Sequence, residues 1–173
     1  IVEIEALGRR IKSFKAAPPS IREFWLSTAV WGERPYLAYE DEVLTYAQTH
    51  AHAAAIAAWL WERGLRPGDR VAIAMRNFPE WMVIYWACAS IGLAVVGMNA
   101  WWTAEEMDYA LKDSEPKVLF ADKERLARLA ECPARPGMAV VGVRLDAWPE
   151  GVIRYGDVIA HGGAMPEVAV DPD

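Results

Sequence analysis

The sequence has few of the residues that build disulfide frameworks or metal sites. Its two cysteines, Cys88 and Cys132, lie far apart, so neither a disulfide framework nor a zinc-ligand spacing is present. Cys88 falls within an apolar helical run, where a reduced and buried thiol is expected. The three histidines, His50, His52 and His161, have no cysteine or carboxylate at ligand spacing. We therefore expect no metal site in this chain.

The chain also lacks an excess of positive charge. It has 18 lysines and arginines against 24 acidic residues, which gives a formal net charge of −6. Because nucleic-acid backbones are bound by basic faces, this balance disfavours nucleic acid as the main partner. Its short basic groups are mixed with acids, and we interpret them as solvated surface. They are Arg9-Arg10-Lys12, Arg63-Arg66-Arg70 and Lys123-Arg125-Arg128.

No targeting segment is visible. The chain starts at Ile1 rather than at methionine, so we expect it to be trimmed or incompletely observed. Residues 81–98 form an uncharged run of 18 residues, the lower limit for a membrane-spanning helix. This run contains Ser90, Gly92 and Gly97 and ends in a short β-rich stretch, so a buried helix, a turn and a buried strand explain it better. We expect no transmembrane segment and a cytoplasmic protein.

Motifs for phosphate binding and nucleophilic catalysis are absent too. The sequence contains no Gly-x-Gly-x-x-Gly, no Gly-x-x-x-x-Gly-Lys-Ser/Thr and no Gly-x-Ser-x-Gly. The turn at residues 76–79 precedes a predicted helix whose N-terminus could bind an anion, but we prefer the interpretation that Asn77 caps that helix. The carboxylates are scattered or lie at helix ends. The residues alone therefore give no active site and no catalytic residue.

What the sequence does contain is an alternation of apolar runs and helical segments. Apolar β-like runs cover residues 70–75, 93–98, 117–121 and 138–143, and helical patterns separate them. Short strands alternating with helices are typical of βαβ units. This pattern predicts an α/β fold with a mainly parallel sheet of about four strands and helices on both faces, in three layers.

The segments before this alternation are shorter. Residues 1–19 are weakly patterned and end in Pro18-Pro19, so we predict an N-terminal arm, followed by one subdomain over residues 20–173. Residues 36–40 and 42–45 predict a small hairpin. His50 and His52 follow on an alanine-rich helix, where a structural or surface role is the preferred interpretation. Four capping boxes mark helix starts, namely Ser20 with Glu23, Thr45 with Gln48, Asn77 with Glu80 and Thr103 with Glu106.

Helical signals continue beyond the fourth box. In the helix that starts at Thr103, Asp108 and Lys112 are predicted to pair four residues apart. Asp122 is predicted to cap the next helix, which runs to about Glu131. A short helix around Tyr155 is the last predicted element before the chain ends.

Five stretches of the sequence resemble the N-terminal part of the acyl-CoA synthetases. These belong to the adenylate-forming, AMP-binding enzymes, with firefly luciferase and the adenylation domains of peptide synthetases. Each motif is weak alone, but the five occur in the family's order and cover residues 36 to about 122. They are Leu44-Thr45-Tyr46, residues 64–73 (GLRPGDRVAI), Asn77-x-x-Glu80-Trp81, residues 92–99 (GLAVVGMN) and residues 106–114 (EMDYALKDS).

The resemblance implies the function of a larger parent enzyme. In this family, ATP and a carboxylic acid give an acyl-adenylate and pyrophosphate, and the thiol of coenzyme A then displaces AMP. Mg²⁺ and basic groups stabilise the phosphoryl charge. Residues 167–173 resemble the segment just before the family's phosphate loop. We therefore expect an inactive N-terminal fragment, truncated before that loop, with every catalytic residue beyond Asp173 and no tightly bound ATP, Mg²⁺ or coenzyme A.

The sequence departs from the family's pattern at one informative place. Where the family often has Pro-Leu-Asn-Pro, this chain has Gly97-Met98-Asn99-Ala100, and Trp101 stands where some members have a basic residue that contacts coenzyme A. Asn99, Trp101 and Trp102 are therefore weak candidates for an acyl or pantetheine channel. Packing of the two tryptophans against another part of the protein is the preferred interpretation.

Three further questions stay open at this point. The chain is either part of a coenzyme A ligase, part of a family member that loads a carrier protein, or a stand-alone α/β binding or assembly module without ligase activity. The acid substrate is not determined, because fatty, aryl and short-chain acids all fit. Apolar surface left uncovered on the fragment favours self-association, for example as a homodimer.

Overall fold

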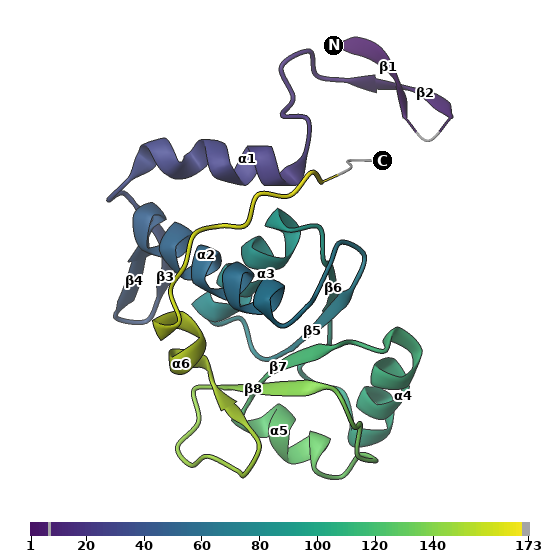
Figure 1. Ribbon diagram of the computed structural model, residues 1–173, viewed down its shortest axis with the longest axis vertical. Coiled ribbons are helices and arrows are strands. Elements are labelled where there is room, and N and C mark those ends of the chain that lie inside the picture. Colours follow the sequence, from purple (N-terminus) through teal and green to yellow (C-terminus); the bar gives the residue numbers. More distant parts are fainter. Residues whose placement is uncertain (7, 171–173) are drawn as a thin grey trace.

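The computed structural model describes residues 1–6 and 8–170. Its centre is a parallel sheet of five strands in the order β6-β5-β7-β8-β9 (Figure 1). The predicted α/β class and the mainly parallel sheet are therefore confirmed. The strands are β5 (Arg70–Ala74), β6 (Ala94–Gly97), β7 (Val118–Asp122), β8 (Ala139–Val143) and β9 (Ile153–Arg154). The two-residue strand β9 is additional to the four that the sequence predicts.

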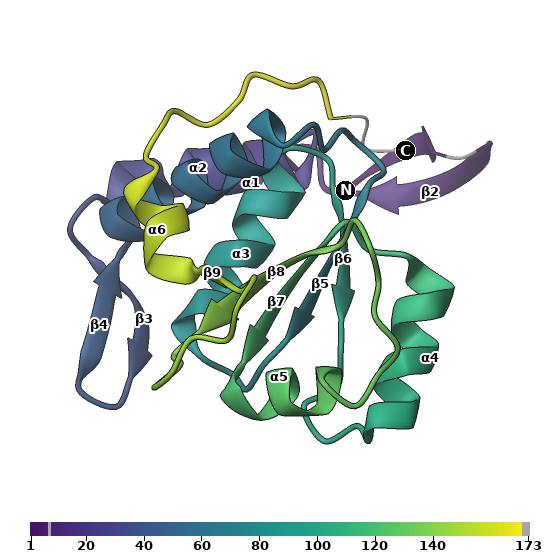
Figure 2. The same cartoon turned by 60° about the horizontal axis from the view of Figure 1, so that its bottom comes forward.

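Both faces of the sheet are covered because its central strands are apolar on both sides. Successive side chains of a strand point to opposite faces. In β5, Val71 and Ile73 belong to one buried cluster, and Ala72 and Ala74 belong to another. Helices α2, α3 and α6 lie on the first face, with α1 outside them, and α4 and α5 lie on the second (Figure 2). This gives the predicted three layers.

Local signals mark several helix starts, with an exception at Asn77 described below. The bounds of the helices are α1 (Ile21–Ser27), α2 (Tyr46–Glu62), α3 (Pro79–Ser90), α4 (Ala104–Ser114), α5 (Lys123–Leu129) and α6 (Tyr155–Ala160), with a 3-10 turn η1 (Thr28–Trp31) after α1. At α1 one of the two predicted capping-box bonds forms, because the Ser20 hydroxyl accepts the Glu23 N–H at 3.1 Å. At α2 and α4, both hydrogen bonds of the predicted capping boxes form. Helix α2 ends in a Schellman motif in which Leu65 N–H donates to the Leu60 carbonyl and Gly64 has a φ of 84°.

Two antiparallel hairpins flank the parallel sheet. Strands β3 (Pro35–Tyr39) and β4 (Glu42–Thr45) form the hairpin that the sequence predicts. The N-terminal arm, whose sequence is weakly patterned, contains a second hairpin of β1 (Val2–Ala6) and β2 (Arg9–Ser13). Cross-strand pairs such as Glu3 with Lys12 and Ile4 with Ile11 fix its register. In both views it projects away from the helices and the sheet (Figures 1 and 2).

The uncharged run at residues 81–98 is part of the core. It supplies most of α3, which is apolar on nearly every side, and then β6. Within the described residues, no helix has the length and apolarity needed to cross a membrane. The run is apolar because α3 is packed between the sheet and the helices α1 and α2.

After α6 the chain crosses the helical layer without regular structure. We call residues 162–170 the C-terminal strap. It runs over α2 and toward α1 in both views (Figures 1 and 2). Met165 and Val168 of the strap pack against the buried cluster on this side of the sheet.

Candidate functional site

A cleft lies at the carboxyl ends of β5, β6 and β7. Parallel strands end at the same edge of a sheet, so the loops that follow them lie together (Figure 2). The helices after β5 and β7 lie on opposite faces of the sheet, and such a switch point is where open α/β sheets bind ligands. The cleft measures about 850 Å³ and is lined by Tyr39, Trp81, Glu124, residues 75–78 and residues 97–102.

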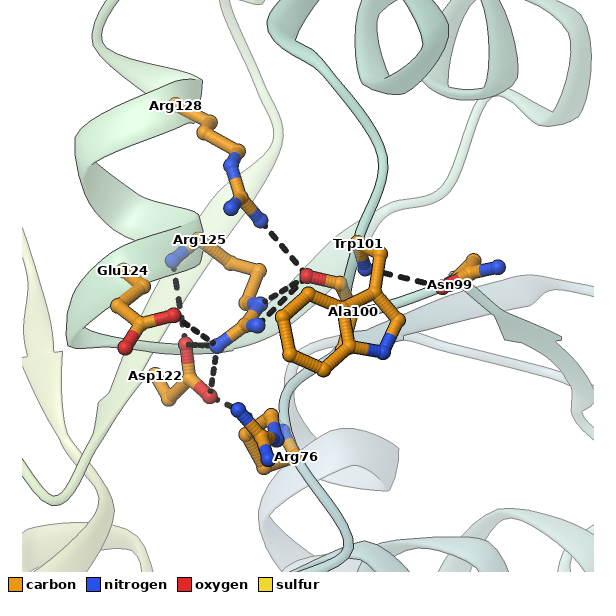
Figure 3. Close-up of polar contacts among 8 residues, drawn as sticks. All are labelled: Arg76, Asn99, Ala100, Trp101, Asp122, Glu124, Arg125 and Arg128. Atoms are coloured by element: carbon orange, nitrogen blue, oxygen red, sulfur yellow. Dashed lines mark hydrogen bonds and ion pairs between the residues drawn. The ribbon is translucent and has the colours of Figure 1, made fainter.

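Asp122, at the end of β7, ties two of these loops together. Its carboxylate caps α5 by accepting a hydrogen bond from the Arg125 backbone N–H at 3.1 Å, as the sequence predicts. The same carboxylate accepts the Arg76 backbone N–H at 3.0 Å, which fixes the turn after β5 (Figure 3). This second contact joins residues 46 positions apart, so no local pattern signals it.

Arg125 extends this tie to the loop after β6. Its side chain is only 2% exposed and donates to both Asp122 oxygens, at 2.9 and 3.1 Å. Its Nε and second terminal nitrogen donate to the Ala100 carbonyl at 2.9 and 2.6 Å, and Arg128 donates to the same oxygen at 2.7 Å (Figure 3). A buried guanidinium that is paired and fully hydrogen-bonded holds its partners firmly. These hydrogen bonds therefore fix the loop after β6, which carries Asn99, Trp101 and Trp102.

The structure brings Asn99, Trp101 and Trp102 onto one wall of the cleft. The Asn99 side chain stabilises its own turn, because its Oδ1 accepts the Trp101 backbone N–H at 2.9 Å. Trp101 is 70% exposed, and the Arg76 guanidinium lies 4.7 Å from the centre of its ring. Trp102 is half-buried and packs against the cluster beneath α4. Of the two tryptophans, Trp101 therefore presents most of its surface to solvent at the cleft.

The prediction that Asn77 caps α3 is wrong. The helix begins at Pro79, and its N-cap is Phe78, which has no side-chain oxygen to offer. A residue before proline is driven to extended backbone, and Phe78 has φ −81° and ψ 157°, so the boundary falls one residue after Asn77. Asn77 lines the cleft instead. Glu80, the predicted partner in the capping box, binds Arg144.

Arg144 is a residue that the sequence analysis missed. It follows β8 with a φ of 54° and donates to Glu80 at 2.9 Å and to both oxygens of Glu42 at 2.9 and 2.7 Å. The hydrogen bonds from Arg144 hold the pKa of the Glu42 carboxyl below its usual value. They also raise the pKa of Arg144. The guanidinium stacks on Tyr39 and Phe78, so it joins the β3–β4 hairpin to the cleft.

Histidine and cysteine side chains lie away from the cleft. His50 stacks on Trp25 with 3.9 Å between ring centres and lies 3.0 Å from the Thr28 hydroxyl, and burial lowers its pKa. This is the structural role that the sequence predicts. Burial raises the pKa of the Cys88 thiol, which is free and buried as expected. Within residues 1–6 and 8–170, no three His, Cys, Asp or Glu side chains gather as a metal site would require.

Comparison with known proteins gives a consistent picture. The profile of the family described as AMP-binding enzyme matches residues 24–172. The fatty acid–acyl-carrier-protein ligase ScoC of Streptomyces coeruleorubidus is 34% identical over 116 residues, which cover 66% of this chain and 22% of that protein. The medium/long-chain-fatty-acid–CoA ligase FadD6 of Mycobacterium tuberculosis is 36% identical over 110 residues, covering 63% of this chain and 18% of the relative. This chain thus spans about a fifth of the length of these curated relatives.

Solved structures share the fold. The anthranilate CoA ligase AuaEII, in complex with anthranoyl-AMP, superposes on 90% of this chain with a TM-score of 0.78 at 20% identity, using 31% of its own length. A benzoate CoA ligase from Burkholderia xenovorans covers 87% of this chain with a TM-score of 0.76 at 14% identity, using 30% of its own length. At these identities the likeness establishes the arrangement of helices and strands.

Proposed function

Because the chain belongs to the family of AMP-binding enzymes, we propose that it forms the leading part of an ATP-dependent acid–thiol ligase. The whole enzyme joins a carboxylic acid to the thiol of coenzyme A. The observation that carries this proposal is the match of the family profile across residues 24–172. Relatives named as coenzyme A and acyl-carrier-protein ligases support a thiol as the acceptor.

The proposed chemistry solves the problem that a carboxylate is a poor acyl donor. In the first step a carboxylate oxygen attacks the α-phosphorus of ATP, and the bond to pyrophosphate breaks, which leaves an acyl-adenylate. In the second step the thiolate sulfur attacks the acyl carbon, and the bond to AMP breaks. AMP is a far better leaving group than an oxide ion, so the thioester forms readily.

We propose that ATP and Mg²⁺ are bound mainly by other parts of the enzyme. The described residues contain no cluster of three metal-ligating side chains, and the turn after β5, at residues 75–78, has no glycine with which to cradle a phosphate. We derive no step through either group from these residues. In our proposal the nucleotide chemistry belongs to parts of the enzyme outside this chain.

The role we assign to this chain is to build one wall of the acceptor channel. Trp101 offers a broad apolar surface at the cleft, and Arg76 stacked on it adds a positive charge at the same place. The pantetheine arm of coenzyme A is a chain of methylene groups and two amides, and its end opposite the thiol is joined to a diphosphate, so an aromatic face beside a guanidinium suits it. Asp122 and Arg125 act indirectly, because they hold the loops that carry Arg76 and Trp101.

The reaction class is tested on the full-length enzyme by acid-dependent exchange of pyrophosphate into ATP. A panel of fatty, aryl and short-chain acids is used, because the acid is not determined. We expect exchange with at least one acid and thioester formation when coenzyme A is added. Absence of exchange with every acid would reject the adenylation step.

The channel role predicts that Trp101→Ala raises the KM for coenzyme A by about tenfold, which corresponds to about 1.4 kcal/mol. Pyrophosphate exchange does not involve the acceptor and should be unchanged. Trp31→Ala is the matched control, because Trp31 is also a partly exposed tryptophan but lies on η1, outside the cleft. Equal KM values for both variants and the wild type would reject the channel role.

A carrier protein is a second candidate acceptor. The observation that favours it is the 34% identity to an acyl-carrier-protein ligase. Thioester formation is therefore measured side by side with coenzyme A and with a phosphopantetheinylated carrier protein. Transfer to the carrier alone would reassign the acceptor while leaving the adenylation step in place.

A further inference from the structure

Arg22 is a buried cation without an acidic partner. It lies on α1, is 8% exposed and pairs with no carboxylate among the described residues. Burial of an unpaired charge is costly, so such a side chain needs other compensation. One terminal nitrogen donates to the Ser90 carbonyl at the end of α3, and the other donates to the Pro166 carbonyl at 2.8 Å. The negative end of the α3 dipole also stabilises the charge.

These two contacts join segments that are far apart in the sequence. Ser90 is 68 residues from Arg22, and Pro166 is 144 residues away and belongs to the C-terminal strap. A guanidinium presents several donors in a rigid fork, so it can bind two carbonyls at once, whereas a lysine ammonium is a single point charge. The side chain thus clasps the strap to α1 and α3.

Other contacts keep the strap close against the helices. Gly163 has a φ of 106°, and a Cβ added there would lie 2.8 Å from the Ala58 Cβ of α2. Only glycine fits this close approach. Met165 and Val168 pack into the buried cluster on either side of Pro166. The strap is therefore held along its length, with Arg22 as its only charged anchor among the described residues.

We propose that Arg22 is a positioning residue, which clasps residues 162–170 and so fixes the point from which the following chain departs. Helix α3 starts at the cleft and its 12 residues end at Ser90, about 18 Å away. Pro166 is clasped beside that far end. Chain beyond residue 170 must run back along the length of α3 to reach the cleft. A shift of the strap would therefore displace the residues that this chain brings to the site.

The proposal rests on the proposed function for its effect on activity, since it assumes that chain beyond residue 170 completes the nucleotide site. Arg22→Lys in the full-length enzyme keeps the charge and removes the fork. We expect amide exchange in peptides covering residues 162–170 to become at least about tenfold faster. We also expect the KM for ATP in the exchange assay to rise about tenfold, with kcat per folded enzyme changed less than about threefold.

Arg66→Lys is the matched control. Arg66 also donates to carbonyls near a helix end, those of Trp61 and Leu65, and it stacks on the Trp61 ring, but these partners lie within five residues of it. It should change neither readout. Gly163→Ala is the second variant, because it pushes the strap off α2 without touching Arg22. We expect it to speed up amide exchange in residues 162–170 and to raise the KM for ATP, as Arg22→Lys does. It therefore still tests the proposal if Arg22→Lys fails to fold.

The outcomes separate the two proposals. If the wild-type enzyme shows no acid-dependent exchange, the proposed function fails, and amide exchange still tests the clasp. If the wild type is active but strap exchange in Arg22→Lys and Gly163→Ala equals that of the wild type, the clasp is wrong. If the strap loosens while the KM for ATP stays constant, Arg22 is structural only and its positioning role is rejected.

Discussion

The two hairpins have similar strands but very different surroundings. Strands β1 and β2 pair over five residues each, and β3 and β4 pair over nearly the same length. In β1–β2 the cross-strand pair Ile4 and Ile11 remains 41% and 45% exposed, and the hairpin projects from the molecule (Figure 1). Its ion pair between Glu3 and Arg10 is exposed as well. Register and charge complementarity alone therefore leave this hairpin without a packed face.

The β3–β4 hairpin is anchored at both ends. The ring centre of Tyr36 lies 5.6 Å from that of Trp25, and the Tyr36 hydroxyl accepts a hydrogen bond from the Trp86 ring nitrogen at 2.7 Å. At the turn end, Arg144 binds Glu42 and stacks on Tyr39. A two-stranded hairpin is marginal in water unless it packs on a third element. We therefore expect the docking contacts, and not the strand pairing, to determine the stability of each hairpin.

The largest loss of stability is expected from Arg144→Met, which removes the anchor at the turn end of β3–β4. The substitution keeps an apolar stem over Tyr39 but removes every hydrogen bond to Glu42 and Glu80. Loss of such a network typically costs a few kcal/mol. A partly exposed ion pair contributes up to about 1 kcal/mol, and Arg144 makes two, so we expect a reduction of up to about 2 kcal/mol in the free energy of unfolding. Urea denaturation gives this value, and hydrogen exchange should show faster opening of β3–β4.

Arg10→Met is the matched change on the other hairpin. It also removes an arginine from an ion pair with glutamate, but both side chains are largely exposed, at 80% and 57%. The expected cost is below about 0.5 kcal/mol. If the two substitutions cost the same, the contrast between a docked and an undocked hairpin does not hold.

A smaller effect is expected on the pH dependence of the free energy of unfolding, through Glu42. Hydrogen bonding by Arg144 lowers the pKa of Glu42 in the folded state. A carboxyl whose folded pKa is lowered stabilises the protein fully above its unfolded pKa of about 4.3, and this stability is lost as pH falls through the lower folded value. Glu42→Gln should therefore flatten the loss of stability below about pH 4.5.

The double variant separates this contact from other acid effects. In the Arg144→Met background the cause of the pKa shift is gone, so Glu42→Gln should add no further change in pH dependence. Unfolding free energies between about pH 3 and 7 test this in all four proteins. If Glu42→Gln flattens the pH dependence of the unfolding free energy equally in the wild type and in Arg144→Met, another partner of Glu42 causes that dependence.

The sequence predicts those parts of the fold whose causes are local. The capping pairs at Thr45 and Thr103 act within one turn, and each appears with both of its hydrogen bonds. Apolar runs of strand length predict the parallel sheet, because both faces of its central strands are buried. The boundary at Asn77 fails although it is local, because the restriction that Pro79 places on Phe78 outweighs the capping signal.

Partners distant in the sequence could not be predicted. Asp108 pairs with Arg135 at 2.5 Å, 27 residues away, and not with Lys112 as the helical spacing suggests. At the candidate site, the sequence selects Asn99, Trp101 and Trp102, which share a loop. It does not reveal that Arg125 fixes this loop, because that contact depends on how α5 packs beside α4 and the loop after β6. Long-range arginine contacts of this kind have no periodic signature.

The smallest expected effect comes from removing the β1–β2 hairpin altogether. Deletion of residues 1–14 takes away two strands and the exposed Phe14, but few groups that pack against the remaining protein. Hydrophobic stabilisation scales with the apolar area buried, so little should be lost. We expect the urea midpoint and the slope of the transition to match those of the undeleted chain, and exchange at β5 and β7 to be unchanged. A loss of about 2 kcal/mol, comparable to that of Arg144→Met, would show that this hairpin is docked in solution and would remove the contrast.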